Sequence, residues 1–204
     1  MKVIAALTLI SSAAAFAPAA QQSQSSSALA AKPFADALGA QAPLGLWDPL
    51  GMVSDGNQEN FDYLRSQEIK HGRVAMLAVV GYLTTAAGIR FPGAEEIPDG
   101  LKAFPALLES DAGKNVLLQF FAFTAVAEIA NREAEWLNVK PEFVGDYRNG
   151  FLDLGWDGFD DATKMKKRAI ELNNGRAAMM GIWGLIIHEQ IGVSILPGGY
   201  LPGH

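Results

Sequence analysis

The chain has 204 residues, no cysteine and a formal net charge of -6, and 50% of its residues are hydrophobic. The length suits one domain, and the lack of cysteine excludes disulfides, zinc–thiolate sites, iron–sulfur clusters and cysteine nucleophiles. An acidic chain without a basic stripe is not typical of a nucleic-acid-binding protein. Charged residues make up 19% of the chain, below the roughly 25% of soluble domains. The apolar excess lies in a few blocks, which indicates a membrane protein.

Residues 1–31 predict targeting rather than a folded domain. Lys2, a short apolar run and the small residues before position 16 are typical of a signal peptide over 1–15. Residues 16–31 are rich in Ser, Gln and Ala and contain no acid, as in a plastid transit segment. We therefore predict that the mature domain covers 32–204.

Three apolar blocks in the mature chain predict an all-α membrane protein with transmembrane helices over about 68–89, 115–131 and 169–191. A soluble bundle of fully buried helices is the alternative. Of the lysines and arginines in the mature chain, twelve precede the first block or separate the second from the third, and three separate the first two blocks. The positive-inside rule then places the two ends of the mature chain on opposite sides, with the first and third helices parallel.

The first and third blocks repeat each other at an offset of 103 residues. EIKHGR at 68–73 matches ELNNGR at 171–176 in glutamate, glycine and arginine, and His71 aligns with Asn174. Repeats in the same orientation imply a pseudo-twofold axis along the membrane normal. We expect the first and third helices to cross about this axis.

The glutamate and arginine of each repeat are five positions apart and point away from each other on a helix. An unpaired charge inside a bilayer costs at least a few kcal/mol. We therefore predict ion pairs between the repeats, Glu68 with Arg176 and Glu171 with Arg73. Small residues would let the helix backbones approach, and they are Gly72, Ala75, Gly175 and Ala178.

The pairing leaves His71 and Asn174 without a role. His71 can simply donate to a backbone carbonyl, and the alternative is metal ligation. Glu68 and His71 are spaced like the Glu-x-x-His of di-iron bundles, but the second repeat has Glu-x-x-Asn. Asparagine suits a hard cation such as Mg²⁺. Single, separated ligands suit a metal whose other positions are filled, such as the magnesium of chlorophyll.

These segments resemble the chlorophyll-binding light-harvesting superfamily, and within it the fucoxanthin–chlorophyll a/c proteins of diatom-type plastids. The resemblance rests on EIKHGRVAMLAVVGYL, ELNNGRAAMMGIWGLIIHEQIGVSILP, FADALGAQAPLGLWDPLG and EFVGDYRNGFLDLGWDGFDDATKMKKRAIELNNGR. It covers nearly the whole mature chain and is weakest over 90–140.

The resemblance implies axial ligands to chlorophyll magnesium at Glu68, His71, Glu171, Asn174 and His188. On the second helix Glu128 is the best candidate and Gln119 a weaker one, since a helix carbonyl can equally satisfy Gln119. Asp48 in WDPLG and Asp157 in GWDGF lie where the family's loops hold carotenoid end groups. The chain departs from the green-plant pattern at Arg132, which follows Glu128 by four positions rather than three.

The resemblance implies a light-harvesting antenna, not an enzyme, that binds chlorophyll a, chlorophyll c and fucoxanthin or a related xanthophyll. It implies a multi-pass thylakoid protein with a stromal mature N-terminus and a lumenal C-terminus. Its partners would be thylakoid lipids, other antenna subunits in a homo- or hetero-oligomer, and photosystem I or II.

Three alternatives remain. A photoprotective, energy-dissipating member of the superfamily would sense pH through lumenal acids (Glu95, Glu96, Asp99, Glu109 and Asp111). A di-iron membrane oxidase would use the Glu-x-x-His spacing. A proton or ion carrier would explain acids and imidazoles within the apolar blocks, such as Glu128 and His188.

Overall fold

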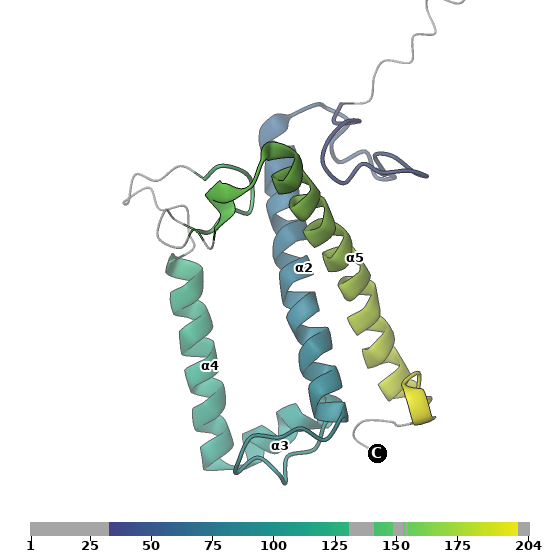
Figure 1. Cartoon of the computed structure of the whole chain (residues 1–204). Coiled ribbons are helices and arrows are strands. Elements are labelled where there is room, and N and C mark those ends of the chain that lie inside the picture. Colours follow the sequence, from purple (N-terminus) through teal and green to yellow (C-terminus); the bar gives the residue numbers. More distant parts are fainter. Residues whose placement is uncertain (1–32, 131–140, 149–152, 154, 200–204) are drawn as a thin grey trace, which may run out of the picture. The chain divides into compact units, whose positions relative to one another are not determined.

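The computed structural model describes residues 33–130, 141–148, 153 and 155–199 (Figure 1). These residues belong to two compact units, which divide between Gly56 and Asn57. The predicted signal and transit segments, 1–31, and Arg132 lie outside the described residues. Within the described residues the β pairing is limited to one isolated bridge, and every regular element is a helix. The predicted all-α class is confirmed.

The described part of the first unit, residues 33–56, is a series of turns, and Asp48 organises one of them. Its carboxylate oxygens accept hydrogen bonds from the N–H groups of Met52 and Val53, both at 3.0 Å. Val53 is buried, whereas Trp47 and Leu50 are exposed. Asp48 therefore closes the WDPLG loop on itself.

The second unit contains four α-helices in the described residues: α2 (Gln58–Ala86), α3 (Ala103–Glu109), α4 (Asp111–Ala130) and α5 (Asp161–Ile191). Helices α2, α4 and α5 contain most of the three predicted spans. Both α2 and α5 begin well before those spans, and the short α3 was not predicted. The polar segments before the apolar blocks are rich in Glu, Gln, Lys and Arg, which are good helix formers, so the helices extend through them.

Each long helix has a local feature of the sequence that marks where the helix begins or ends. Asn57 caps α2, because its side-chain oxygen accepts from the N–H of Glu59 at 3.0 Å. The Ser110 hydroxyl accepts from the N–H of Gly113 at 2.9 Å at the start of α4. Gly192 ends α5 in the left-handed region with a φ of 79°.

By length and mean hydropathy, none of the helices in the described ranges meets the usual requirement for a segment that crosses a membrane. The three transmembrane spans expected from the apolar blocks therefore stay a prediction.

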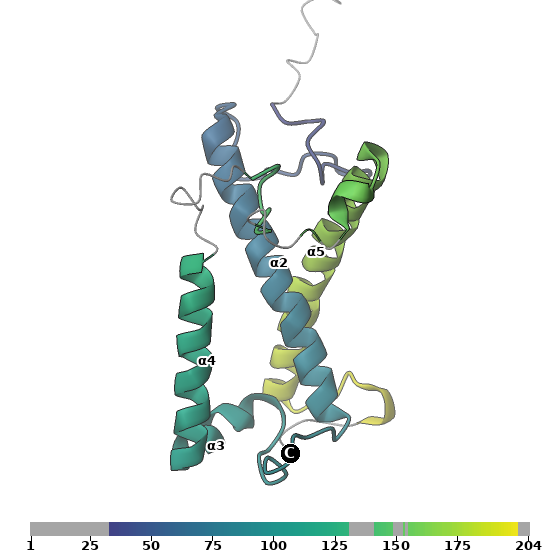
Figure 2. The ribbon, with the colours of Figure 1, turned by 60° about the vertical axis from the view of Figure 1, so that its left-hand side comes forward.

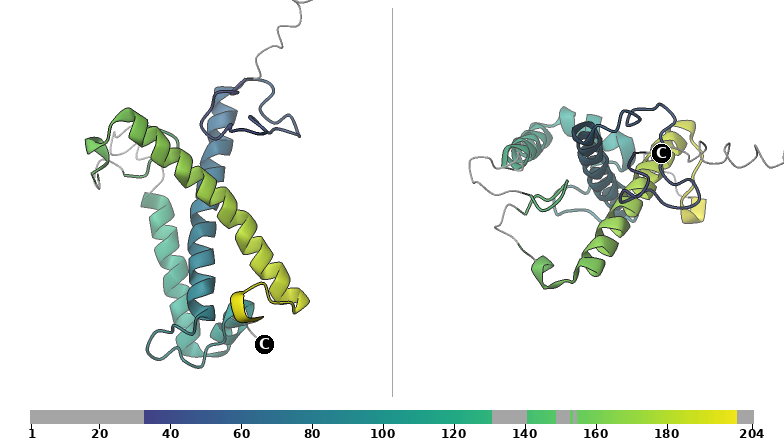
Figure 3. Two further views of the ribbon diagram at one scale, coloured as in Figure 1. Left: turned by 45° about the vertical axis from the view of Figure 1, so that its right-hand side comes forward. Right: turned by 90° about the horizontal axis from the view of Figure 1, so that it is seen from above.

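Helices α2 and α5 run in the same direction and cross (Figures 2 and 3). Their backbones are in contact at Gly72 and Gly175, where a Cβ built on either glycine would lie 2.9 Å from the Cα of the other. Helix α4 stands on the side of α2 away from α5 (Figures 1 and 2). Among the described residues of this unit, the buried hydrophobic side chains are few: Ala75, Leu172 and Leu185.

Candidate pigment-binding site

Two ion pairs bridge α2 and α5 at their crossing. Arg73 Nε lies 2.6 Å from Glu171 Oε1, and Arg176 Nε lies 2.7 Å from Glu68 Oε1. The structure thus brings together the residues that the repeat predicts as partners. The carboxylate side chains stay 33% and 27% exposed for Glu171 and Glu68, respectively. Each carboxylate is therefore neutralised across the helix pair while part of it still faces outward.

Glu68 has a second partner that the sequence analysis missed. Arg65 Nη1 donates to Glu68 Oε2 at 2.6 Å, one helical turn earlier on α2. At an offset of 103, Arg65 aligns with Arg168, which also lies one turn before its glutamate. This further match in the repeat could have indicated both arginines. In the structure only the α2 arginine bonds its own glutamate, whereas Arg168 lies over the ring of Phe143.

His71 is exposed on α2, and its Nδ1 lies 2.7 Å from the backbone oxygen of Gln67. A carbonyl only accepts hydrogen bonds, so Nδ1 carries a proton, and in the neutral imidazole Nε2 has a lone pair. His71 therefore makes the carbonyl contact expected of a purely structural histidine. In the neutral form it also has the lone pair that ligation requires. Asn174, its counterpart on α5, is also exposed.

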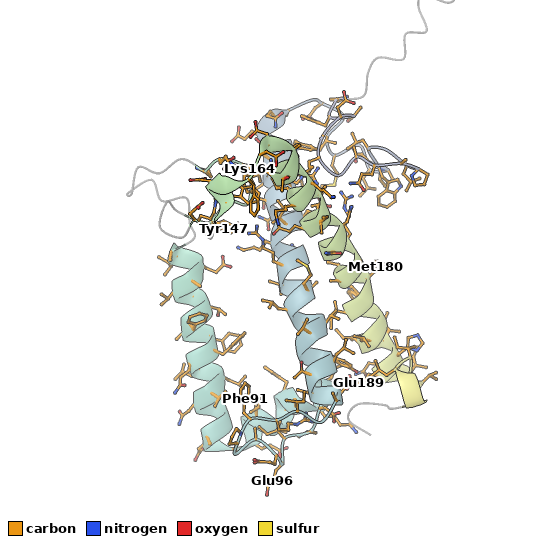
Figure 4. All side chains as sticks on the ribbon, viewed as in Figure 1. Phe91, Glu96, Tyr147, Lys164, Met180 and Glu189 are labelled. Atoms are coloured by element: carbon orange, nitrogen blue, oxygen red, sulfur yellow. The ribbon has the colours of Figure 1, made fainter. Side chains whose placement is uncertain are left out.

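His188 is half-buried near the end of α5, and its Nδ1 lies 3.1 Å from the backbone oxygen of Val193. The same argument leaves its Nε2 with a lone pair. The next residue, Glu189, is 4% exposed. Its carboxylate accepts from the hydroxyl of Tyr82 at 2.8 Å and from the N–H of Leu101 at 2.7 Å (Figure 4). Sequence reasoning missed Glu189. Its two hydrogen bonds connect α5 to α2 and to the loop that follows α2.

On α4, Gln119 and Glu128 are both exposed. Glu128 Oε2 lies 2.5 Å from Nζ of Lys70 on α2. The sequence analysis considered only Arg132 as a partner for Glu128. Arg132 lies outside the described residues, and within them Glu128 pairs with a residue of another helix, 58 positions away in the chain.

Loop acids have different environments. Among the acids that a lumenal pH sensor would use, Asp99 is buried and lies 3.9 Å from Arg90, whereas the others are exposed. In the described ranges, no three His, Asp or Glu side chains gather closely enough to hold a metal ion together.

Arg148 organises the loop before α5. Its Nε donates to Asp146 Oδ1 at 2.8 Å, and Nη2 donates to Glu142 Oε2 at 2.9 Å. These hydrogen bonds lower the pKa of Asp146 from 3.8 to about 2 and raise the pKa of Arg148. Asp157 lies 3.6 Å from Nη1 of Arg148, with a side chain that is 79% exposed. The Arg148 guanidinium also stacks over the ring of Trp156.

The same loop touches α2 (Figure 4). The Arg73 guanidinium lies 5.3 Å from the ring centroid of Tyr147. A Cβ added to Gly145 would come within 3.0 Å of the Ile69 side chain. The loop thus covers one side of the arginine that pairs with Glu171, and it helps to hold that ion pair in place.

The donor set fits the magnesium of a chlorophyll, which needs one axial ligand with an available lone pair. Glu171 uses one oxygen for Arg73, and Glu68 shares its two oxygens between two arginines, which leaves lone pairs on both carboxylates. The neutral imidazoles of His71 and His188 each offer one unprotonated ring nitrogen. These donors occur singly along the helices, as a metal that is already held by a ring requires.

Comparison with known proteins identifies the class to which this fold and donor set belong. The sequence profile of the family described as "Chlorophyll A-B binding protein" matches residues 34–190. The chain belongs to this family. The prediction of a chlorophyll-binding protein rather than an enzyme is confirmed.

Individual relatives are similar along almost the entire chain. Fucoxanthin-chlorophyll a-c binding protein A, chloroplastic, of Phaeodactylum tricornutum is 51% identical over 97% of this chain and 100% of its own length. A fucoxanthin-chlorophyll a-c binding protein of Trieres chinensis is 49% identical over 96% of this chain and 97% of its own length. One from Macrocystis pyrifera is 44% identical over 78% of this chain and 73% of its own. The resemblance to fucoxanthin–chlorophyll a/c proteins predicted from the sequence is confirmed.

Proposed function

We propose that this protein is a light-harvesting antenna of the chloroplast thylakoid that binds chlorophyll a, chlorophyll c and fucoxanthin or a related xanthophyll. The names of its relatives support the pigment classes and the chloroplast. Bound chlorophyll supplies the light absorption and the transfer of excitation toward a photosystem. The chain's own residues hold the pigments at set positions and orientations.

One observation carries this proposal: the ligand-bearing helices bury very little of their apolar surface against protein. No described side chain is less than 2% exposed, and large apolar residues remain exposed along all three long helices. They include Val74, Leu77 and Val80 on α2, Phe121, Phe123 and Val126 on α4, and Met180, Trp183 and Ile187 on α5. Exposed apolar surface on this scale indicates a partner that covers it. Pigment rings and lipid chains are that partner here, because candidate magnesium ligands lie on the same helices.

We propose that Glu68, His71, Glu171, Asn174 and His188 are axial ligands on α2 and α5, with Glu128 and the weaker candidate Gln119 on α4. Asp48 and Asp157 belong to the loops proposed to hold carotenoid end groups. Asp48 would act there indirectly, since its carboxylate is occupied by backbone N–H groups of its own loop.

We further propose that α2, α4 and α5 cross the thylakoid membrane, with the mature N-terminus in the stroma and the C-terminus in the lumen. The uneven distribution of lysine and arginine supports this orientation. Cross-helix pairing lowers the cost of placing Arg73 and Arg176 in lipid, because each forms a neutral pair with a carboxylate.

The deciding experiment is an absorption spectrum of the purified protein followed by pigment extraction. We expect chlorophyll a, chlorophyll c and a xanthophyll in fixed ratios, with excitation of the xanthophyll giving chlorophyll a fluorescence. A stably folded chain that is colourless would contradict the proposal. Chlorophyll fluorescence that shortens in lifetime at low pH would instead favour the photoprotective alternative.

A further inference from the structure

The motif EIKHGR contains one ionisable residue that the pairing and ligand assignments leave without a role. This residue is Lys70, and its Nζ lies 2.5 Å from Glu128 Oε2 on α4. We propose that Lys70 is a positioning residue for the chlorophyll site on α4. Its ammonium neutralises Glu128 and holds one carboxylate oxygen, so that the other oxygen is presented to magnesium. This inference rests on the proposed function.

Within the described bounds of α4, no cation lies close in sequence to Glu128. It is the one charged residue of α4 between Lys114 and the end of the helix at Ala130. A lone carboxylate among apolar side chains and lipid costs several kcal/mol unless it is paired. The lysine side chain can reach across from α2 because its long apolar stem lies along the helix while its charged end meets the acid.

The repeat shows why the cation comes from α2. At the offset of 103, the position equivalent to Lys70 is Asn173 on α5. Helix α4 lies beside α2, on the side away from α5 (Figures 1 and 2). A lysine is therefore required only in the repeat that faces α4. The two copies of the motif differ at the position where α4 breaks the twofold symmetry.

The geometry resembles that of the central ion pairs. Arg73 binds one oxygen of Glu171, and Lys70 likewise binds one oxygen of Glu128. In both cases the second oxygen remains as a donor to a metal. Partners that orient a metal ligand typically contribute about 10- to 100-fold in metal affinity. We expect Lys70 to contribute within this range to chlorophyll retention at α4.

The test uses the mature chain reconstituted with chlorophyll a, chlorophyll c and fucoxanthin. Retention of each chlorophyll is followed by pigment extraction as detergent concentration increases. We expect K70Q to weaken retention of a single chlorophyll class by about 10- to 100-fold and K70R to restore most of it. The control K114Q removes the exposed pair with Asp111 on α4 and should leave retention unchanged.

A second comparison shows whether Lys70 acts through Glu128. In the E128A background, K70Q should cause no further loss. Additive losses, or full retention in K70Q alone, would overturn the inference. If K70Q fails to assemble, assembly of K70Q/E128A would assign the failure to an unpaired carboxylate and support the inference, whereas failure of both would overturn it. A wild-type chain that takes up no chlorophyll would instead contradict the proposed function.

Discussion

Gly72 on α2 and Gly175 on α5 are equivalent residues of the internal repeat, and their backbones touch at the helix crossing. A Cβ at either position would lie 2.9 Å from the Cα of the other residue. This close approach brings each arginine within reach of the glutamate on the opposite helix. The glycines and the ion pairs therefore form one structural unit.

Replacing Gly72 with alanine should push α2 and α5 apart. We expect G72A to destabilise the reconstituted complex by about 1–3 kcal/mol, as overpacking of a tight contact does. Thermal unfolding, followed by the loss of pigment circular dichroism, measures this change.

Gly81 on the same helix is the matched control, since a Cβ there would meet no atom within 4 Å. G81A should be neutral or stabilising by about 0.5–1 kcal/mol, because alanine favours helix over glycine. Equal behaviour of the two variants would show that the glycine contact contributes nothing.

Charge reversal tests the pair Arg73–Glu171, which is preferable to Glu68–Arg176 because Glu68 also binds Arg65. R73E and E171R each place like charges together and should lower the stability of the complex by about 1–3 kcal/mol. The double variant R73E/E171R restores an attractive pair and should recover a large part of the loss. Thermal unfolding followed by far-UV circular dichroism is the measurement, because pigment yield would also register the loss of Glu171 as a proposed ligand. A double variant no better than the worse single would argue against direct pairing.

The loop around Arg148 should lose stability in acid. Arg148 holds the pKa of Asp146 at about 2, below its ordinary 3.8. A carboxyl group with a lowered pKa stabilises the fold at pH values above its ordinary pKa. This contribution disappears as pH falls from about 4 to about 2. We expect a loss of about 1–2 kcal/mol after allowing for solvent screening.

Trp156 lies in the same cluster, with its ring centroid 5.5 Å from that of Phe143. It therefore reports this transition. Its fluorescence, in a chain whose other tryptophans are replaced by phenylalanine, should change between about pH 4 and 2. D146N should remove this step. An unchanged acid profile in D146N would rule out Asp146 as its origin.

Glu189 should stabilise the contact between the C-terminal ends of α2 and α5 and the loop that follows α2. E189A removes the acceptor for Tyr82 and for the N–H of Leu101, two part-buried hydrogen bonds that typically contribute about 0.5–1.5 kcal/mol each. Y82F leaves the Leu101 bond intact and should cost less, about 1 kcal/mol. Protease sensitivity of residues 87–102 measures the release of the loop. Equal sensitivity of E189A and the wild type would contradict this role.

Much of the site could be predicted from the repeat, and some of it could not. The cross-helix partners follow from two copies of one motif and from the cost of unpaired charge, so Glu68, Arg73, Glu171 and Arg176 can be matched by sequence alone. Arg65 also has a counterpart in the repeat, and a longer comparison would have found it. Lys70 and Glu189 have no such signal. The partner of Lys70 belongs to a segment outside the repeat, and the residues equivalent to Tyr82 and Glu189 in the other copy are Leu185 and Ala86, which cannot form the same contact.

The sequence by itself determined the helical class, the family, the crossing of two related helices and the pairing of their charges. Hydrophobic periodicity and the need to balance charges can both be read along a single chain. Only the tertiary structure decided that Lys70 meets Glu128 and that Glu189 meets Tyr82. Those contacts depend on which side of α2 is occupied by α4 and on how the loops fold back, and neither is encoded in spacing along the sequence. They arise when separate segments pack together and each charge in an apolar setting must find a partner in space.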